Sequence, residues 1–278
     1  MTSWWAARRR GSRSAPSEAE PDAALPELPE VERARSLVET KALGRRIADV
    51  DDSDTWVCRP HAPGEIAAAL TGTSLVEAHR RGKAMWVETD GGPALGLHLG
   101  MAGRIVVDGG DSGHRWDRFT LRFEDGGSLA LRDKRRLGRV VLAPDLSRLG
   151  PDVALVTRRE FRERVGRGRA PVKARIMDQA RIAGVGNLLA DEALWRARLS
   201  PLREAGSLSE SELDELRRAL RFATRRATER GGVHTGDLIA HRREGGHCPR
   251  CGAPLERATV GGRTTWWCPV EQPLTPAA

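Results

Sequence analysis

The strongest constraint on the fold is an abrupt change in hydrophobic periodicity about halfway along the 278 residues. Strand-like segments come first, at 83–89, 94–99, 103–108, 118–124 and 128–132. In one of them, Phe119, Leu121 and Phe123 alternate with polar residues, which predicts a half-buried antiparallel strand followed by a hairpin turn. From 157 to 230 helical spacing replaces this alternation. The pattern predicts an α+β chain in which a β-sandwich with a flanking helix precedes a helical domain.

A proline-acid doublet, Pro-Glu-Leu-Pro-Glu at residues 26–30, stands directly before the first helical pattern. Val31, Ala34 and Leu37 then recur at helical spacing, and Gly44 closes the run. The acids therefore lie at or just before a helix N-terminus, where negative charge is favoured. One interpretation is a simple helix start, with prolines presetting the first turn. The other is a functional site.

Composition and the chain start restrict the setting. Residues 1–25 are rich in Ala, Arg, Ser, Pro and Glu without periodicity, which predicts disorder. They contain no apolar stretch typical of a secretory signal, and no segment reaches the roughly 18 apolar residues of a membrane span. We therefore expect a cytoplasmic protein. Lys and Arg number 46 against 38 Asp and Glu, a net charge of +8, which favours an acidic partner such as nucleic acid.

Three cysteines lie close together near the C-terminus. Cys248 and Cys251 have the spacing of a zinc half-site, and Cys268 follows. Glu271 stands where a zinc ribbon would have its fourth cysteine. Because carboxylate oxygen can bind zinc, we expect one zinc ion per chain with Glu271 as the fourth ligand; His247 or water are other candidates. A metal-free hairpin is the alternative.

Three further segments have both a functional and a simpler interpretation. The hairpin-like segment 261–267 presents Arg263, either as a phosphate ligand or as a solvated side chain. Gly-Val-Gly-Asn at 184–187 precedes a helix and offers N–H groups to an anion, or is only a turn between helices. The basic turn 135–137 has an apolar tip, which would suit a wedge entering a duplex, although charge runs are usually solvated.

Together these motifs resemble the formamidopyrimidine-DNA glycosylase and endonuclease VIII family of base-excision repair enzymes. The resemblance covers residues 26–273, and its motifs include His-Leu-Gly-Met-Ala-Gly, Asp-Lys-Arg-Arg-Leu-Gly and Gly-Arg-Thr-Thr-Trp-Trp-Cys-Pro. It implies a catalytic β-sandwich domain at 26–150, a helix-two-turn-helix domain at 151–232 and a zinc-finger-like hairpin at 245–273. Double-stranded DNA with a damaged base or abasic site would lie between them. We expect a monomer, associated with the nucleoid if the source is bacterial.

The resemblance also implies roles for individual residues. Pro26 would be the nucleophile that attacks the sugar C1′ and forms a Schiff base. Glu27 would open the sugar ring as the acid, supported by Glu30. Lys83 would act in β-elimination while contacting phosphate, and Arg263 would act in δ-elimination.

The DNA-binding residues implied by the resemblance come from all three segments. Met101 would fill the gap left by a flipped base, while Arg135 and Leu137 occupy the side of the opposite strand. Such wedges offset the few kcal/mol that unstacking costs. Lys173 and Asn187 would grip phosphates. The complete expected set is His98, Met101, Arg118, Arg135, Arg136, Leu137, Lys173, Asn187 and Arg263.

Four features depart from the family pattern. Pro26 follows residues 1–25 in this sequence, and an amide nitrogen within a chain is not a nucleophile. We therefore expect an active protein to begin at Pro26. Leu137 stands where the formamidopyrimidine branch usually has Phe, and Arg118 where it often has a phosphate-contacting His. The segment 231–248 is shorter than the branch's lesion-capping segment.

The sequence thus predicts a bifunctional DNA glycosylase and AP lyase for oxidised bases of the formamidopyrimidine or 8-oxoguanine type. Two alternatives stay open. One is a catalytically silent protein that binds damaged DNA, and the other is a glycosylase for oxidised pyrimidines. Trapping of a Schiff base with borohydride separates the silent protein from both enzymes.

Overall fold

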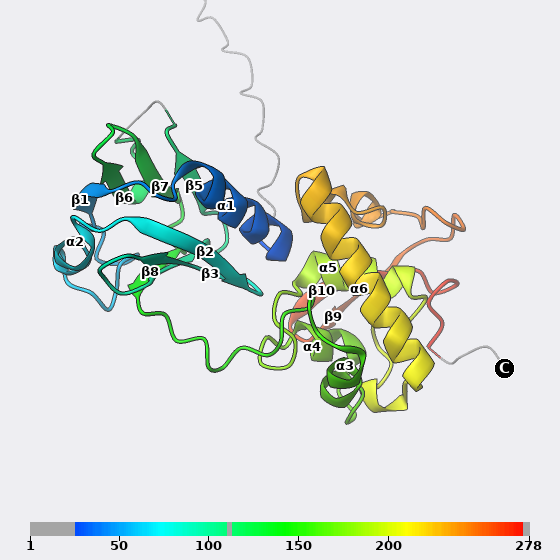
Figure 1. Cartoon of the computed structure of the whole chain (residues 1–278). Helices are drawn as coiled ribbons and strands as arrows, with labels where there is room; N and C mark the ends of the chain where they lie inside the picture. The colour runs from blue at the N-terminus through cyan, green and yellow to red at the C-terminus, as the bar shows by residue number, and fades with distance from the viewer. Residues whose placement is uncertain (1–25, 110–112, 275–278) are drawn as a thin grey trace, which may run out of the picture.

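The structure is a computed structural model that describes residues 26–109 and 113–274. Residues 1–25, for which the sequence predicts disorder, lie outside the described residues. The chain forms two parts (Figure 1). The first contains two helices and eight strands: α1 (Leu28–Lys41), β1 (Ile47–Asp51), α2 (Glu65–Leu70), β2 (Leu75–Arg81), β3 (Ala84–Thr89), β4 (Leu95–His98), β5 (Arg104–Val107), β6 (Asp117–Phe123), β7 (Ser128–Arg132) and β8 (Arg139–Leu142).

The strands form two four-stranded antiparallel sheets, with orders β1-β6-β7-β5 and β2-β3-β4-β8. Their inner faces share one core, in which Leu97, Phe119 and Leu131 are buried. The predicted α+β class and β-sandwich are confirmed, and each of the five predicted strand segments contains a strand. The sequence interpretation missed β1, β2 and β8. In β2 the pairing register shifts between Leu75 and Glu77, so its buried residues do not alternate regularly.

The second part is mainly helical. Its elements are α3 (Arg158–Val165), α4 (Val172–Met177), α5 (Asn187–Arg196), α6 (Glu210–Arg230), the short 3-10 helices Ala205–Ser207, Val233–Thr235 and Ile239–His241, and a hairpin of β9 (Glu256–Val260) and β10 (Arg263–Trp267). Ser209 and Glu212 form the expected capping box at the start of α6. The helix ends at Gly231, whose positive φ of 105° suits a glycine C-cap.

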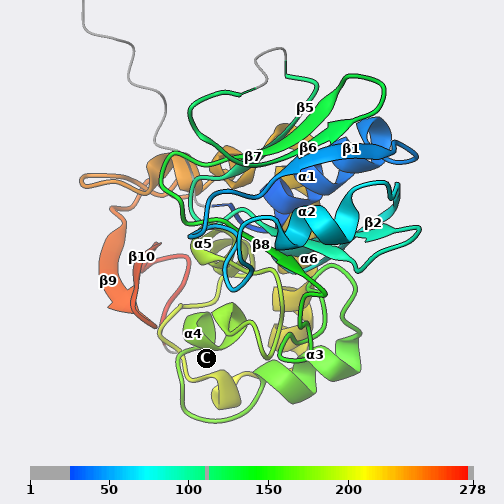
Figure 2. The same ribbon diagram turned by 90° about the vertical axis from the view of Figure 1, so that its left-hand side faces the viewer.

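Helix α1 joins the two parts. Most of its buried residues, including Val31 and Val38, belong to the sandwich core. Leu28, at its first turn, belongs instead to the core of the helical part. The first turn of α1 therefore points at α5 and α6, while the hairpin β9–β10 and α6 lie on opposite sides of α5 (Figures 1 and 2). In the part of the chain that the structure describes, no helix is long and apolar enough to cross a membrane.

Candidate active site

Glu27 caps a helix that begins 160 residues further along the chain. Its two carboxylate oxygens accept hydrogen bonds from the N–H groups of Leu188 (2.8 Å) and Leu189 (3.1 Å), in the first turn of α5. Gly186 makes this approach possible, because a Cβ there would lie 2.1 Å from the Glu27 Cδ atom. The anion that the Gly-Val-Gly-Asn segment binds is thus a carboxylate of the same chain, at a helix terminus that favours negative charge.

Burial determines the protonation behaviour of Glu27. The residue is only 2% exposed, and loss of solvation raises the pKa of its carboxyl group. The positive charge of Lys83 and the two N–H donors oppose this shift without cancelling it. A carboxyl group with a raised pKa retains its proton to higher pH and can act as a general acid.

Glu30 forms a second link between α1 and the helical part. One of its oxygens accepts the N–H of Glu27 at 2.9 Å, and the other accepts the N–H of Val233 at 2.7 Å. Gly232 precedes this contact with a φ of 144°, and a Cβ there would lie 2.6 Å from the Glu30 carboxylate. The acid doublet therefore fixes the start of α1 through backbone donors from two separate segments.

Lys83 lies in the turn between β2 and β3, within electrostatic range of Glu27, Glu30 and Arg263. Burial lowers the pKa of Lys83, the carboxylate of Glu27 raises it, and the charge of Arg263 lowers it further; the net effect is a lowered pKa. The preceding residue, Gly82, has a φ of 60°, and a Cβ there would lie 2.6 Å from that of Ala183. The hairpin tip therefore packs directly on the loop that precedes α5.

Two residues that hold this hairpin were missed by the sequence interpretation. The buried carboxylate of Asp152 accepts the N–H of Gly82 at 2.7 Å and a guanidinium hydrogen of Arg80 at 2.5 Å. Arg80 also donates to Glu32 of α1 at 2.8 Å. No spacing pattern could have revealed this group, because its members come from three distant segments.

The predicted wedge residues lie side by side. Met101 and Leu137 are each 40% exposed. Their loops are in contact, since a Cβ on Gly100 would lie 2.3 Å from the carbonyl carbon of Leu137. The buried Asp133 carboxylate fixes the second loop by accepting N–H groups of Arg135 (2.9 Å), Leu137 (2.7 Å) and Gly138 (2.7 Å). This role of Asp133 was also missed.

Two of the expected phosphate ligands are engaged within the protein. The guanidinium of Arg118 donates to the Asp133 carbonyl at 2.9 Å, which ties it to the base of the wedge loop. Arg136 has a φ of 54° and pairs with Asp54 at 2.7 Å. His98 is exposed at the end of β4, where its Nδ1 accepts the N–H of Gly100 at 3.0 Å.

Lys173 requires a correction. Its side chain is 0% exposed and forms a 2.6 Å ion pair with the equally buried Asp191. Its ammonium group also donates to the side-chain oxygens of Asn187 and Thr265, each at 2.7 Å. Because every donor direction points into the protein, Lys173 does not contact a phosphate here. It orients Asn187, which is partly exposed at the start of α5, and links α4 to β10.

A groove of about 1100 Å³ lies beside the first turns of α1. The walls come from both parts of the molecule, because Pro26 and Glu30 face the wedge loop and Thr228 of α6. Several basic residues line it: Arg33, Arg104, Arg132, Lys134 and Arg135. A cationic groove of this size suits a polyanion.

The three C-terminal cysteines converge. The sulfur atoms of Cys248, Cys251 and Cys268 all lie within 4.8 Å of one another. The indole N–H of Trp195 donates to the Cys248 sulfur at 3.3 Å, and the N–H of Glu271 donates to the Cys268 sulfur at 3.4 Å. Three thiol groups with N–H donors around them fit a metal ion that prefers thiolate ligands.

The expected fourth ligand is not in place. The carboxylate of Glu271 pairs with Arg250 at 2.8 Å and lies 3.6 Å from Arg198. It does not belong to the group of converging ligand atoms, and neither does His247. The cationic partners of Glu271 hold its oxygens away from the thiols, so the described arrangement does not support Glu271 as the fourth ligand.

The hairpin beside these cysteines presents Arg263 as predicted. Its turn consists of Gly261 and Gly262, with φ of 57° and 73°, and Arg263 is the exposed first residue of β10. A Cβ on Gly261 would lie 3.0 Å from that of Ala174, so the turn packs on α4. Glu27 and Glu30, from the start of α1, thus gather with Lys83, Asn187 and Arg263 from three other segments.

Comparisons with known proteins agree with this geometry. Residues 25–140 match the family described as the formamidopyrimidine-DNA glycosylase N-terminal domain, and residues 149–237 match its H2TH domain. The formamidopyrimidine-DNA glycosylase of a Nocardioides species is 36% identical, over 90% of this chain and 95% of its own length. That of a Roseiflexus species is also 36% identical, over 88% of this chain and 98% of its own length.

Solved structures give the same result. The MutM (Fpg) protein of Thermus thermophilus is 36% identical with a TM-score of 0.76, covering 90% of this chain and all 100% of its own. Lactococcus lactis Fpg in complex with abasic-site DNA is 26% identical with a TM-score of 0.79, covering 89% and 100%. The two family domains together span more than half of the sequence, and the chain belongs to the formamidopyrimidine-DNA glycosylase family.

Proposed function

We propose that this protein is a DNA glycosylase with AP lyase activity that removes oxidised bases in base-excision repair. The observation that carries the proposal is the buried Glu27 carboxyl group, whose pKa is raised and which lies next to Pro26 at the edge of a cationic groove. Lys83 and Arg263 approach the same point. Relatives that cover nearly the whole chain carry this enzyme name.

The chemistry begins at Pro26. A free secondary amine there attacks C1′ of the damaged nucleotide, forming an N–C1′ bond while the bond to the base breaks. Glu27 gives its proton to the sugar ring oxygen, which opens the ring and leaves a Schiff base. Lys83 assists β-elimination of the 3′ phosphate, and Arg263 assists δ-elimination of the 5′ phosphate. Glu30 holds Glu27 in position through the backbone contact described above.

Binding and base extrusion use the groove and the wedge residues. Met101 enters the space left by the extruded base, and Arg135 and Leu137 support the opposite strand; their exposure and adjacent loops support this role. The phosphates are contacted by His98, Lys83, Asn187, Arg263 and Arg136. Arg136 does so after its ion pair with Asp54 breaks. With about four to six phosphates neutralised, log K against log salt has a slope of roughly −4 to −5. A slope near zero would contradict this binding mode.

Oxidised purines are the preferred substrates in this proposal, ahead of oxidised pyrimidines. Similar structures include Lactococcus lactis Fpg with Fapy-dG DNA, at 27% identity, and MutM with carbocyclic 8-oxo-G DNA, at 28%. Single-turnover cleavage of duplexes that carry each lesion tests the order. Faster cleavage of thymine glycol than of formamidopyrimidine would reverse it.

A catalytically silent damage-binding protein is the second candidate, favoured by one observation. In the sequence Leu25 precedes Pro26, so the Pro26 nitrogen is an amide unless the preceding residues are removed. The test compares a protein that begins at Pro26 with the 278-residue chain. We expect the first to nick abasic DNA and form a borohydride-trapped adduct, and the second to bind without cutting. If a chain shown to retain residues 1–25 still forms the borohydride-trapped adduct, the nucleophile is a lysine, and Lys83 is the first candidate.

The cysteine group holds one zinc ion in this proposal, with water rather than Glu271 as the fourth ligand. When bound, zinc supplies structural stabilisation to the hairpin that presents Arg263. We propose residues 26–150, 151–232 and 245–273 as the catalytic, helix-two-turn-helix and finger domains of a monomer. We also propose that the protein acts in the cytoplasm, and at the nucleoid if it comes from a bacterium.

A further inference from the structure

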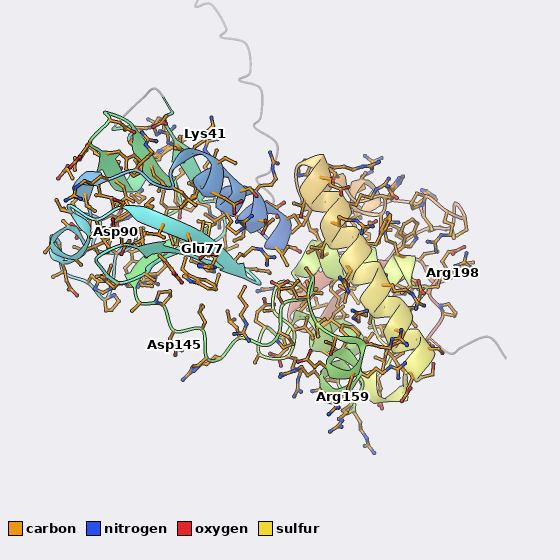
Figure 3. All side chains as sticks on the ribbon, viewed as in Figure 1. Lys41, Glu77, Asp90, Asp145, Arg159 and Arg198 are labelled. Carbon is orange, nitrogen blue, oxygen red and sulfur yellow. The ribbon has the colours of Figure 1, made fainter. Side chains whose placement is uncertain are left out.

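A second group of side chains that could hold a metal ion lies on the outer face of the sandwich, away from the groove. Glu77 and His79 alternate on β2, so both project from the same face of the sheet. Glu88 of β3 is paired directly opposite Glu77. The strand β2 is at the edge of its sheet, and Glu77 is labelled on this part of the molecule in Figure 3.

The ligand atoms have the spacing of a tetrahedral metal site. The Nε2 atom of His79 lies 3.2 Å from an oxygen of Glu88 and 3.6 Å from an oxygen of Glu77. All three ligand atoms lie within 4.8 Å of one another. Ligands bound to zinc at about 2.0–2.2 Å in tetrahedral geometry are separated by about 3.3–3.6 Å. The two distances from His79 Nε2 are close to this separation, so a zinc ion would fit between the three side chains once the carboxylates adjust to it.

The His79 ring is already fixed for this role. It stacks on Trp86, with ring centroids 5.2 Å apart and planes at 21°. Its Nε2 atom is buried and makes no hydrogen bond within the described residues, although both carboxylates are near. The ring nitrogen is therefore shielded from solvent and held between the two carboxylates, in contact with both but without a hydrogen bond to either.

The charges of Glu77 and Glu88 also favour a bound cation. Among the described residues, neither Glu77 nor Glu88 forms an ion pair with Lys or Arg. Like charges directly opposite across an antiparallel pair destabilise a sheet. A divalent cation removes this repulsion, and a neutral imidazole with two carboxylates suits ions of the zinc class.

We propose that Glu77, His79 and Glu88 bind one divalent transition-metal ion of the zinc class, with water completing its coordination. The ion joins the edge strand β2 to β3, the two strands of the hairpin whose turn carries Gly82 and Lys83. It therefore stiffens the hairpin whose tip, at Gly82, packs on the loop before α5. This site is separate from the cysteine group, and it does not depend on the proposed enzymatic activity.

Zinc itself is the probe for the test, with the full-length chain. Wild type, Glu88→Gln and Glu65→Gln are dialysed to equilibrium against the same Zn²⁺ buffer, and zinc per chain is measured by mass spectrometry. Glu65→Gln is the matched control, because it removes a carboxylate from another histidine pair, His61 and Glu65 at 2.6 Å, that is outside the group of three. We expect wild type and Glu65→Gln to bind one zinc more than Glu88→Gln. Equal zinc content in all three would overturn the proposal.

Two further measurements locate the ion. Co²⁺ bound by the cysteines gives thiolate absorption bands, which should be the same in wild type and in Glu88→Gln. Zn²⁺ should slow hydrogen exchange of backbone amides in β2 and β3 in wild type and in Glu65→Gln only. Slowing of the same amides in Glu88→Gln would place the ion elsewhere and refute the site.

Discussion

At the start of α1, two carboxylates are held by hydrogen bonds from the backbone, whereas the three cysteines beside the β9–β10 hairpin form a group that could hold a metal ion. Glu27 and Glu30 accept N–H donors of Leu188, Leu189 and Val233, all from distant segments. Among the residues that the structure describes, the three thiols converge without a fourth protein ligand. The first region is therefore held together within the protein fold, and the second, in the proposed function, is completed by an ion and water. Perturbing each region in turn tests this difference.

The largest expected effect is in the first region. In a protein that begins at Pro26, Glu27→Gln should slow base excision by about 10²- to 10⁴-fold, because general acid catalysis contributes this much. Binding to abasic DNA should change little, since a glutamine oxygen still accepts an N–H of α5. Glu39→Gln, at an exposed position on the same helix, serves as the control. Unchanged base excision in Glu27→Gln would remove Glu27 from the chemistry.

Loss of a thiolate should affect the second region only. Cys251→Ser should reduce zinc affinity by more than the roughly 10- to 100-fold typical of outer-shell changes. Zinc per chain and DNA affinity should fall together, while borohydride trapping at saturating DNA persists. Cys58→Ala is the control, because Cys58 is buried in the sandwich core and lies outside the cysteine group. Loss of trapping in Cys251→Ser would show that the two regions are coupled.

Close packing at the first region predicts an intermediate effect. Gly186→Ala places a methyl group 2.1 Å from Glu27 Cδ, so the carboxylate must move. We expect a loss of about 1–3 kcal/mol in the free energy of unfolding, with reduced excision. Gly91→Ala is the matched control, because a Cβ there meets only a methyl group of Thr73 at 3.6 Å, and it should change stability by less than about 0.5 kcal/mol. Equal stability of the two variants would contradict the tight contact.

The raised pKa of Glu27 predicts a pH effect of known sign. An acid whose pKa is higher in the folded state than in the unfolded state loses stabilisation on ionising. Relative to Glu27→Gln, wild type should therefore become less stable as pH rises from 4.5, the ordinary pKa of a glutamate, through the raised pKa of Glu27. The slope should not exceed about 1.4 kcal/mol per pH unit. Denaturant unfolding of both proteins across this range measures the difference, and the opposite slope would contradict burial as the main cause.

The smallest expected effect concerns Glu271. Because its carboxylate pairs with Arg250 rather than joining the thiols, Glu271→Gln should leave zinc per chain unchanged. The free energy of unfolding should change by less than about 1 kcal/mol, as for other partly exposed ion pairs. Loss of zinc in this variant would restore Glu271 as the fourth ligand and make the second region complete without water.

Local patterns in the sequence determined much of this protein. The alternation of Phe119, Leu121 and Phe123 predicted a strand, and Ser209 with Glu212 predicted the start of α6. The cysteine spacing and the glycine turn before Arg263 also predicted the right local structures. Each of these signals depends on neighbours within a few residues, so a short window of sequence is enough to read it.

Only the tertiary structure decided which groups are paired with one another. Lys173 looked like a free cation in the sequence, but Asp191 and Thr265 enclose it. Asp133 and Asp152 gave no sequence signal, yet they fix the wedge loop and the Lys83 hairpin. Glu27 became a buried acid only when α5 supplied its donors. Burial and partner choice depend on segments far apart in the chain, and the packing of both cores against α1 sets their positions.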